Sequence, residues 1–267
     1  MTTIHSTRLF ITAILLAGVS VAGAGTISFA NTNAIVINDS NTPPTESSPY
    51  PSTIQVTGLE GSAITKVTVQ LTGFAHTFPS DVDIVLVGPG GQNAVLMRDT
   101  GGQEASPVTN VDLTLDDDAA ENLPVDSPLV SGTFKPTQAI PFTFGFPAPG
   151  PTTNSLMGPF LSNFDNTGAD GTWSLFVVDD TSPDSGVITG GWTLNLTTAP
   201  VLLSIATAGT NAVLSWTNAL TGFTLQSTPT LNPPAWTAVA TVPVVVSGNY
   251  TVTNAIGNGA VFYRLAR

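Results

Sequence analysis

Several residue types that support common protein functions are missing or scarce in this sequence. Cysteine is absent, so neither disulfide bonds nor thiolate metal ligands are available. Lysine and arginine together number 6, against 18 aspartates and glutamates, which gives a formal net charge of −12. Nucleic-acid binding needs a basic face, so this balance argues against a nucleic-acid partner.

Charged residues and strong helix formers are also few. Charged residues make up 9% of the chain, whereas Thr and Val are abundant and there are 25 Gly and 21 Pro. Hydrophobic residues make up 42% of 267 residues, which is enough for one or two packed domains. This composition predicts an all-β protein.

The first residues have the pattern of a secretory signal peptide. Arg8 precedes an apolar run over residues 9–24, and Ala22-Gly23-Ala24 and Ser28-Phe29-Ala30 are two small-x-small cleavage sites. The alternative is a membrane anchor, but the run is short and no basic stop-transfer segment follows it. We therefore expect residues 1–24 to be removed, leaving a secreted or cell-surface protein without a membrane span.

From about Asn31 the pattern is one of short strands. Val67, Val69 and Leu71 alternate with polar residues, which is the period of a half-buried strand. Residues 82–88 are apolar on both faces, as in the central strand of a sandwich. Residues 139–160 are rich in Pro, Gly and Phe and predict a long packed loop.

The acidic residues mark a boundary between two β domains. All 18 of them lie between Asp39 and Asp184. Thr197-Thr198-Ala199-Pro200 then has the composition of a short linker. We expect one domain over residues 31–198 and a smaller β-sandwich-like module over 201–267.

An ordered series of segments in the first domain resembles a known family. These segments are 50–56 (YPSTIQV), 67–91 (VTVQLTGFAHTFPSDVDIVLVGPGG), 113–120 (LTLDDDAA), 131–136 (SGTFKP), 171–180 (GTWSLFVVDD) and 184–196 (DSGVITGGWTLNL). Together they resemble the P domain, or homo B domain, of proprotein convertases and bacterial subtilisin-like proteases. The resemblance is closest to the stand-alone secreted bacterial form. It implies a jelly-roll β-sandwich, often with bound calcium.

The second domain is similar to small β modules at the C-terminus of assorted exported bacterial proteins. The likeness covers about 65 residues and ends in the strand Phe262-Tyr263-Arg264-Leu265. It implies a carried module for sorting, adhesion or packing, without a known activity.

His76 is the sole histidine left after signal removal, because His5 lies in the signal peptide. As a general base it would need an orienting carboxylate, which Asp81 or Asp83 could supply. A subtilisin-type triad also needs a serine with an oxyanion donor, and the chain has no G-x-S-x-G elbow. The alternative is a strand-end histidine that caps a turn, as the family's His-Thr motif implies. We favour the structural role and expect no catalytic residue.

Aspartates are the candidate calcium ligands. They are Asp81, Asp83, Asp116, Asp117, Asp179, Asp180 and Asp184. Only Lys66, Arg98 and Lys135 offset the acids of this domain, and a divalent ion relieves the repulsion among crowded carboxylates. Calcium takes about six to eight oxygen ligands. The alternative is that these residues serve turns and solubility, and no segment has the spacing of an EF-hand loop.

Two carbohydrate-related functions are alternatives to a calcium-binding role. A glycosidase needs paired carboxylates, but among 18 acids such pairs are expected by chance. Tryptophans could stack on sugars, yet Trp173 and Trp192 alternate with Leu175 and Leu194 and predict core positions. We therefore expect a non-catalytic, calcium-stabilised extracellular interaction or protease-accessory protein. The alternatives are an accessory subunit of a separately encoded subtilisin-like serine protease, or a carbohydrate-binding jelly roll.

Overall fold

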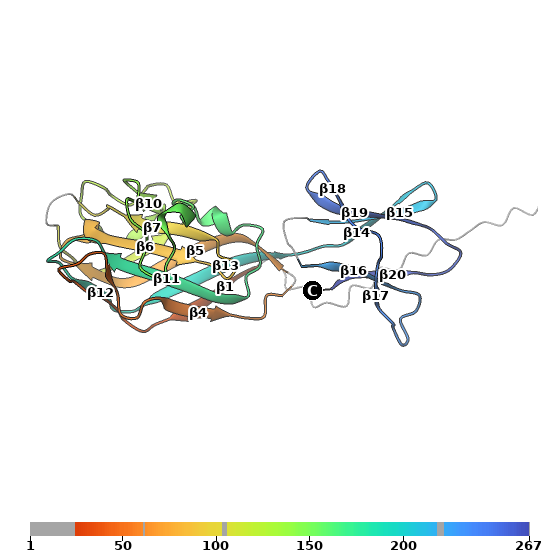
Figure 1. The fold of residues 1–267 in the computed structure, drawn as a ribbon, viewed down its shortest axis with the longest axis horizontal. Helices are drawn as coiled ribbons and strands as arrows, with labels where there is room; N and C mark the ends of the chain where they lie inside the picture. Colours follow the sequence, from red (N-terminus) through yellow and green to blue (C-terminus); the bar gives the residue numbers. More distant parts are fainter. Residues whose placement is uncertain (1–24, 61, 103–105, 218–221, 267) are drawn as a thin grey trace, which may run out of the picture. The chain divides into compact units, whose positions relative to one another are not determined.

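The computed structural model describes residues 25–60, 62–102, 106–217 and 222–266. The chain divides into two compact units between Pro200 and Val201, coloured red to teal and blue in Figure 1. Regular structure in the described residues is β-strand apart from short 3-10 helices, so the predicted all-β class is confirmed. None of the helices in this part of the chain has the length and hydropathy to cross a membrane. The expected signal peptide, residues 1–24, lies outside the described residues.

The first unit is built from two sheets. The seven-stranded sheet has the order β1-β13-β5-β12-β2, with β8 beside β5 and β9 beside β8. Its strands are β1 (Gly25–Asn31), β2 (Ile35–Ile37), β5 (Ser62–His76), β8 (Val108–Leu115), β9 (Gly132–Phe134), β12 (Gly186–Ile188) and β13 (Trp192–Pro200). The six-stranded sheet has the order β10-β7-β6-β11-β3, with β4 beside β11. Its strands are β3 (Thr45–Glu46), β4 (Ser52–Val56), β6 (Val82–Val87), β7 (Asn93–Arg98), β10 (Thr137–Gln138) and β11 (Gly171–Asp179).

The main hydrophobic core takes side chains from both sheets. Along β5, Val67, Val69 and Leu71 are at most 2% exposed, which confirms the alternation predicted from the sequence. Trp173 of β11 and Trp192 of β13 belong to the same core. The first unit is therefore a sandwich whose inner faces are apolar.

A second, smaller core lies on the other face of the six-stranded sheet. Val85 of β6 packs there with Phe146, whereas Ile84 of the same strand belongs to the main core. Phe146 comes from the segment 139–160, which contains no strand and only the 3-10 helix η2 (Thr153–Ser155). Both predictions are confirmed: β6 is buried on both faces, and 139–160 is a packed loop.

Strand β1 begins before the start that the sequence suggested for this domain. It pairs with β13 along its whole length, from Gly25 opposite Thr198 to Asn31 opposite Trp192. Small residues dominate this segment, so its alternation is weaker than that of β5. The first unit therefore reaches back to Gly25 rather than Asn31.

The second unit has two smaller sheets. One has the order β14-β15-β19-β18 and the other the order β17-β16-β20. Their strands are β14 (Ser204–Ala208), β15 (Asn211–Thr217), β16 (Thr224–Thr228), β17 (Thr237–Ala238), β18 (Val244–Val246), β19 (Asn249–Ala255) and β20 (Phe262–Ala266). The buried residues of its core are Ala212, Leu214, Trp216, Leu225 and Val252. This core is thin, so much of the strand surface is exposed.

Candidate functional site

His76 ends β5, and its side chain is fully buried. The backbone N–H of Phe78 donates to Nδ1 at 3.2 Å. Because Nδ1 accepts this bond, the ring proton is assigned to Nε2, which donates to Oδ2 of Asp179 at 3.1 Å. Both ring nitrogens are engaged inside the protein, and the ring closes the turn that follows the strand. The orienting acid is Asp179 rather than Asp81 or Asp83.

The hydrogen bond between His76 and Asp179 joins the two sheets of the first unit. His76 belongs to the seven-stranded sheet, and Asp179 is the last residue of β11 in the six-stranded sheet. The other carboxylate oxygen of Asp179 accepts the N–H of Thr181 at 3.0 Å. Gly186 lies against the imidazole, and a β-carbon at that position would overlap the ring. Glycine is needed there because the backbone carbonyl oxygen of Ala75 and the histidine ring take the space.

A second buried group surrounds the guanidinium of Arg98. Its Nη1 donates to Oδ2 of Asp83 on the adjacent strand β6. The same nitrogen donates to Oδ2 of Asp180 at 3.4 Å, and Nε lies 3.2 Å from Oδ2 of Asp99. The single guanidinium of Arg98 therefore pairs with the carboxylates of three aspartates.

Aromatic side chains of the loop 139–160 cover this group. The guanidinium carbon of Arg98 lies 4.1 Å from the ring centroid of Phe142 and 5.1 Å from that of Phe144. Such contacts stabilise a cation by about 0.5–2 kcal/mol, with the larger values where water is excluded. Arg98 is 3% exposed and Asp83 is fully buried, so the loop keeps the ion pair out of water.

The Arg98 group carries more negative charge than its one cation balances. Burial raises the pKa of Asp83 well above its ordinary value, although Arg98 acts in the opposite direction. Burial also raises the pKa values of Asp99 and Asp180. Within the described residues, Oδ1 of Asp83 and Oγ1 of Thr100 are buried without a hydrogen bond. Protonation of one carboxylate reduces this imbalance.

A third feature at the same end of the sandwich is the carboxylate of Asp81. It ends the 3-10 helix η1 (Pro79–Asp81) and is 8% exposed. Among the described residues, its carboxylate makes no hydrogen bond. Burial, followed by the charges of Asp179, Asp180 and Asp184, raises its pKa to about 7. Four of the seven candidate calcium ligands therefore lie close enough here for their charges to interact.

Asp116 and Asp117 belong to a different part of the first unit. Lys66 bridges Asp116 at 2.9 Å and Asp118 at 2.7 Å. Both oxygens of Asp117 accept backbone N–H groups at the start of the 3-10 helix η3 (Leu161–Phe164). These acids are already paired with a lysine or with backbone donors, so they form a structural group apart from Asp81.

We call the end of the sandwich that carries Asp81, Asp179, Asp180 and Asp184 the acidic end. Its carboxylate oxygens are ligands that calcium prefers, but few of these carboxylates lack a hydrogen bond or ion pair. In the part of the chain that the structure describes, no three His, Asp or Glu side chains are grouped to hold a metal ion. Asp83 and Asp179 are already bonded to Arg98 and His76. A calcium ion here would therefore need backbone carbonyls and water besides Asp81 and a neighbouring acid, a mixture that calcium accepts.

The tryptophans do not form a sugar-stacking surface. Trp173, Trp192 and Trp216 are at most 2% exposed, which confirms the core role predicted for Trp173 and Trp192. The ring of Trp236 is partly exposed, but the guanidinium of Arg264 lies over it at 4.5 Å.

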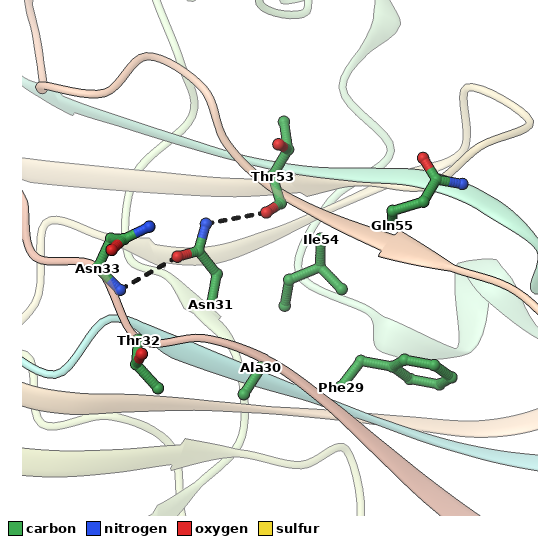
Figure 2. Close-up of a pocket in the computed structure, with 8 residues that line it drawn as sticks. All are labelled: Phe29, Ala30, Asn31, Thr32, Asn33, Thr53, Ile54 and Gln55. Carbon is green, nitrogen blue, oxygen red and sulfur yellow. Dashed lines mark hydrogen bonds between the residues drawn. The ribbon is translucent and has the colours of Figure 1, made fainter.

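A shallow hollow of about 360 Å³ lies between the end of β1 and β4 (Figure 2). Asn31 occupies its centre: its Nδ2 donates to the carbonyl of Thr53 at 2.9 Å, and its Oδ1 accepts the N–H of Asn33 at 3.1 Å. No titratable side chain and none of the sequence-predicted site residues lines the hollow. Its central amide is used to fasten the two strands together.

Sequence reasoning missed Arg98 as the centre of a buried group. Arg98 was recognised only as one of three bases that offset the acids of its domain. The available signal was its position at the end of the apolar strand 93–98, every residue of which is buried. A charge at the end of such a strand needs a buried partner.

Comparisons with protein-family models, with curated proteins and with solved structures find no match for this chain.

Proposed function

We propose that the first unit is a non-catalytic extracellular interaction or protease-accessory domain of the P-domain type, stabilised by calcium at Asp81. The observation that carries the calcium site is the carboxylate of Asp81, a residue 8% exposed, which makes no hydrogen bond within the described residues and feels the charges of three other carboxylates. The sequence segments that resemble the P domain include Asp81, Asp179, Asp180 and Asp184. The extracellular setting follows from the expected signal peptide.

The position of His76 supports the non-catalytic part of the proposal. A general base must reach the proton that it removes, through space or through one water molecule. The His76 ring is buried, and its nitrogens are used by Phe78 and Asp179. A fluorophosphonate probe should therefore leave the protein unlabelled, whereas labelling of one serine that His76→Ala abolishes would overturn this part.

The role proposed for calcium is structural. The ion would neutralise Asp81 together with Asp180 or Asp184, the two neighbours whose carboxylates are partly exposed. Backbone carbonyls and water would complete its coordination. In the calcium-free protein, Asp81 relieves its repulsion by taking a proton, which agrees with its raised pKa.

Thermal unfolding with and without calcium tests the site. An ion that binds only the folded state adds about 2.7 kcal/mol at a hundredfold excess over Kd. For a domain of this size, at about 2–4 °C per kcal/mol, the melting temperature should rise by about 5–11 °C. EGTA should lower the melting temperature, and calcium but not magnesium should restore it.

Three variants distinguish calcium binding at Asp81 from a general effect of the acidic residues. Asp81→Asn should abolish the calcium response. Asp39→Asn should leave it unchanged, because Asp39 is exposed and lies outside the acidic end. Asp117→Asn should lower the melting temperature by weakening the start of η3, yet keep the full calcium response. A wild-type protein that EGTA does not affect would overturn the calcium proposal.

A further inference from the structure

Asn258 and Gly259 lie in the loop that connects β19 to β20 in the second unit. Residues 257–261 of this loop are all exposed. Within the described residues, the side chain of Asn258 makes no hydrogen bond, and the backbone N–H of Gly259 donates none. The side-chain amide and the backbone nitrogen of the next residue are the two groups that react when an asparagine deamidates. Both are therefore accessible here.

Deamidation at this position needs no reactant besides water. The backbone nitrogen of Gly259 loses its proton and attacks Cγ of Asn258, and the side-chain nitrogen leaves as ammonia. This step closes a five-membered succinimide ring, which one water molecule then opens. Attack of the water on one ring carbonyl gives aspartate, and attack on the other gives isoaspartate, in which the main chain runs through the former side-chain carbonyl.

The glycine after Asn258 removes the usual steric obstacle to this reaction. A β-carbon on the following residue hinders the approach of its backbone nitrogen to Cγ, and glycine has no β-carbon. A β-carbon placed on Gly259 would have no atom of a more distant residue within 4 Å, so no neighbour crowds this peptide. Asn258-Gly259 is also the sole Asn-Gly pair in the sequence. Both local sequence and exposure therefore favour this asparagine over the others.

Asp170-Gly171 in the first unit provides an internal contrast, because aspartate before glycine can form the same ring with loss of water. Both carboxylate oxygens of Asp170 accept the backbone N–H of Leu59, at 3.0 Å and 3.2 Å. Gly171 is the first residue of β11 and pairs with Val56 of β4. The structure fixes both residues of this pair, so it should remain unchanged while Asn258 reacts.

We propose that Asn258 is a deamidation site, through which the second unit acquires its first acidic side chain as the protein ages. Residues 201–267 contain no Asp or Glu, so the reaction adds a negative charge to a unit that otherwise carries only arginines. The isoaspartate product also lengthens the main chain by one carbon between β19 and β20, which lie in different sheets. Because the loop is exposed, the fold should accept both products.

Incubation of the purified protein at pH 8, followed by peptide mass spectrometry, tests the site. The peptide that contains Asn258 should gain about 1 Da, because an NH2 group is replaced by OH. Ion-exchange chromatography should resolve a more acidic species that accumulates with time. An isoaspartyl methyltransferase should transfer a methyl group from S-adenosylmethionine to the isoaspartate fraction. At pH 6 the reaction should be slower, because the attacking backbone nitrogen must first lose its proton.

Gly259→Ala is the matched variant, because it keeps Asn258 and adds only a β-carbon. Position 259 has room for that carbon and its φ is not in the positive range, so the variant should fold as the wild type does. Deamidation should slow at least about tenfold, which corresponds to about 1.4 kcal/mol in the activation free energy. Equal rates in wild type and variant, or a gain of mass at another asparagine instead, would overturn the proposal. So would a wild type that keeps its mass over the time in which a synthetic peptide of residues 255–262 deamidates.

Discussion

Nε2 of His76 and Oδ2 of Asp179 lie 3.1 Å apart, on strands that belong to different sheets. Both side chains are at most 1% exposed. The pair has the composition of half a catalytic triad, but it occupies the interior of the sandwich rather than a cleft. Its physical effect is to fasten the ends of β5 and β11, which also positions the acidic segments that follow them.

Replacing His76 by Phe should destabilise the first unit. The substitution keeps an aromatic ring but leaves the Asp179 carboxylate and the Phe78 N–H without this partner. Each buried group left unsatisfied costs about 1–3 kcal/mol. The melting temperature should therefore fall by at least about 5 °C, as measured by calorimetry.

Asp179→Asn is the companion variant. The asparagine side chain has one oxygen, which can accept the N–H of His76 or that of Thr181 but not both in the present geometry, so one bond is lost and the loss should be smaller than for His76→Phe. Equal stability of His76→Phe and wild type would contradict the role that we assign to this bond.

The second prediction concerns Arg98 and Asp83. Arg98→Met removes the one cation from a buried group of carboxylates, and breaking such a pair costs about 3–5 kcal/mol. Replacing both partners, as in the double variant Asp83→Leu with Arg98→Met, should recover part of that loss because the fully buried Asp83 carboxylate no longer stays unpaired, although Asp99 and Asp180 still lose their cation. Urea unfolding of the two single variants and the double variant measures the coupling.

Lys135→Met is the control for the loss of a positive charge, because Lys135 is exposed. It should change stability little. Losses that simply add in the double variant would show that Arg98 and Asp83 do not act as a pair.

The third prediction is a pH dependence due to Asp81. Its pKa is about 7 in the folded protein and 3.8 ordinarily, so the folded state holds the proton more tightly. The stability that Asp81 contributes is fully present below pH 3.8 and is lost as the pH rises through 7. In EGTA, Asp81→Asn should therefore gain stability relative to wild type between pH 5 and pH 8.

At pH 8, calcium should make the wild type more stable than Asp81→Asn, because Asp81 is ionised there and able to bind the ion. Melting temperatures at both pH values, with calcium and with EGTA, provide the comparison. A constant difference between variant and wild type across this pH range would show that Asp81 does not titrate there.

Local features of the fold were predictable from the sequence. The alternation in β5, the apolar run of β6 and the burial of Trp173 and Trp192 each depend on neighbours along one strand. The Phe-rich loop 139–160 was also recognised as packed, because Pro and Gly exclude a regular strand there.

The acidic site was only partly predictable, because its contacts join distant segments. Asp81 and Asp179 are brought together by strand order, which periodicity does not reveal. Asp117 has the same residue type and a similar strand-end position, yet it binds the backbone at Leu161 instead. Residue type shows that a carboxylate needs a partner, whereas only the topology shows which partner it has.

The last prediction concerns the N-terminus of the exported protein. Both candidate cleavage sites fit the sequence, but they differ in what they leave of β1. Cleavage after Ala24 keeps the whole strand, whereas cleavage after Ala30 removes all but Asn31. The longer removal would expose the edge of β13 and break the hydrogen bond from Ser28 to Asn195, which measures 2.6 Å.

Intact-mass measurement of the exported protein should therefore find an N-terminus near Gly25. A chain that begins at Asn31 should be less stable, because each lost hydrogen bond contributes about 0.5–1.5 kcal/mol and the pairing of β1 includes several. Its melting temperature should fall by at least about 5 °C. A mature protein that begins at Asn31 with no loss of stability would show that β1 is dispensable. A full-length species embedded in the membrane would instead contradict export with cleavage, because the apolar run 9–24 would then serve as an anchor.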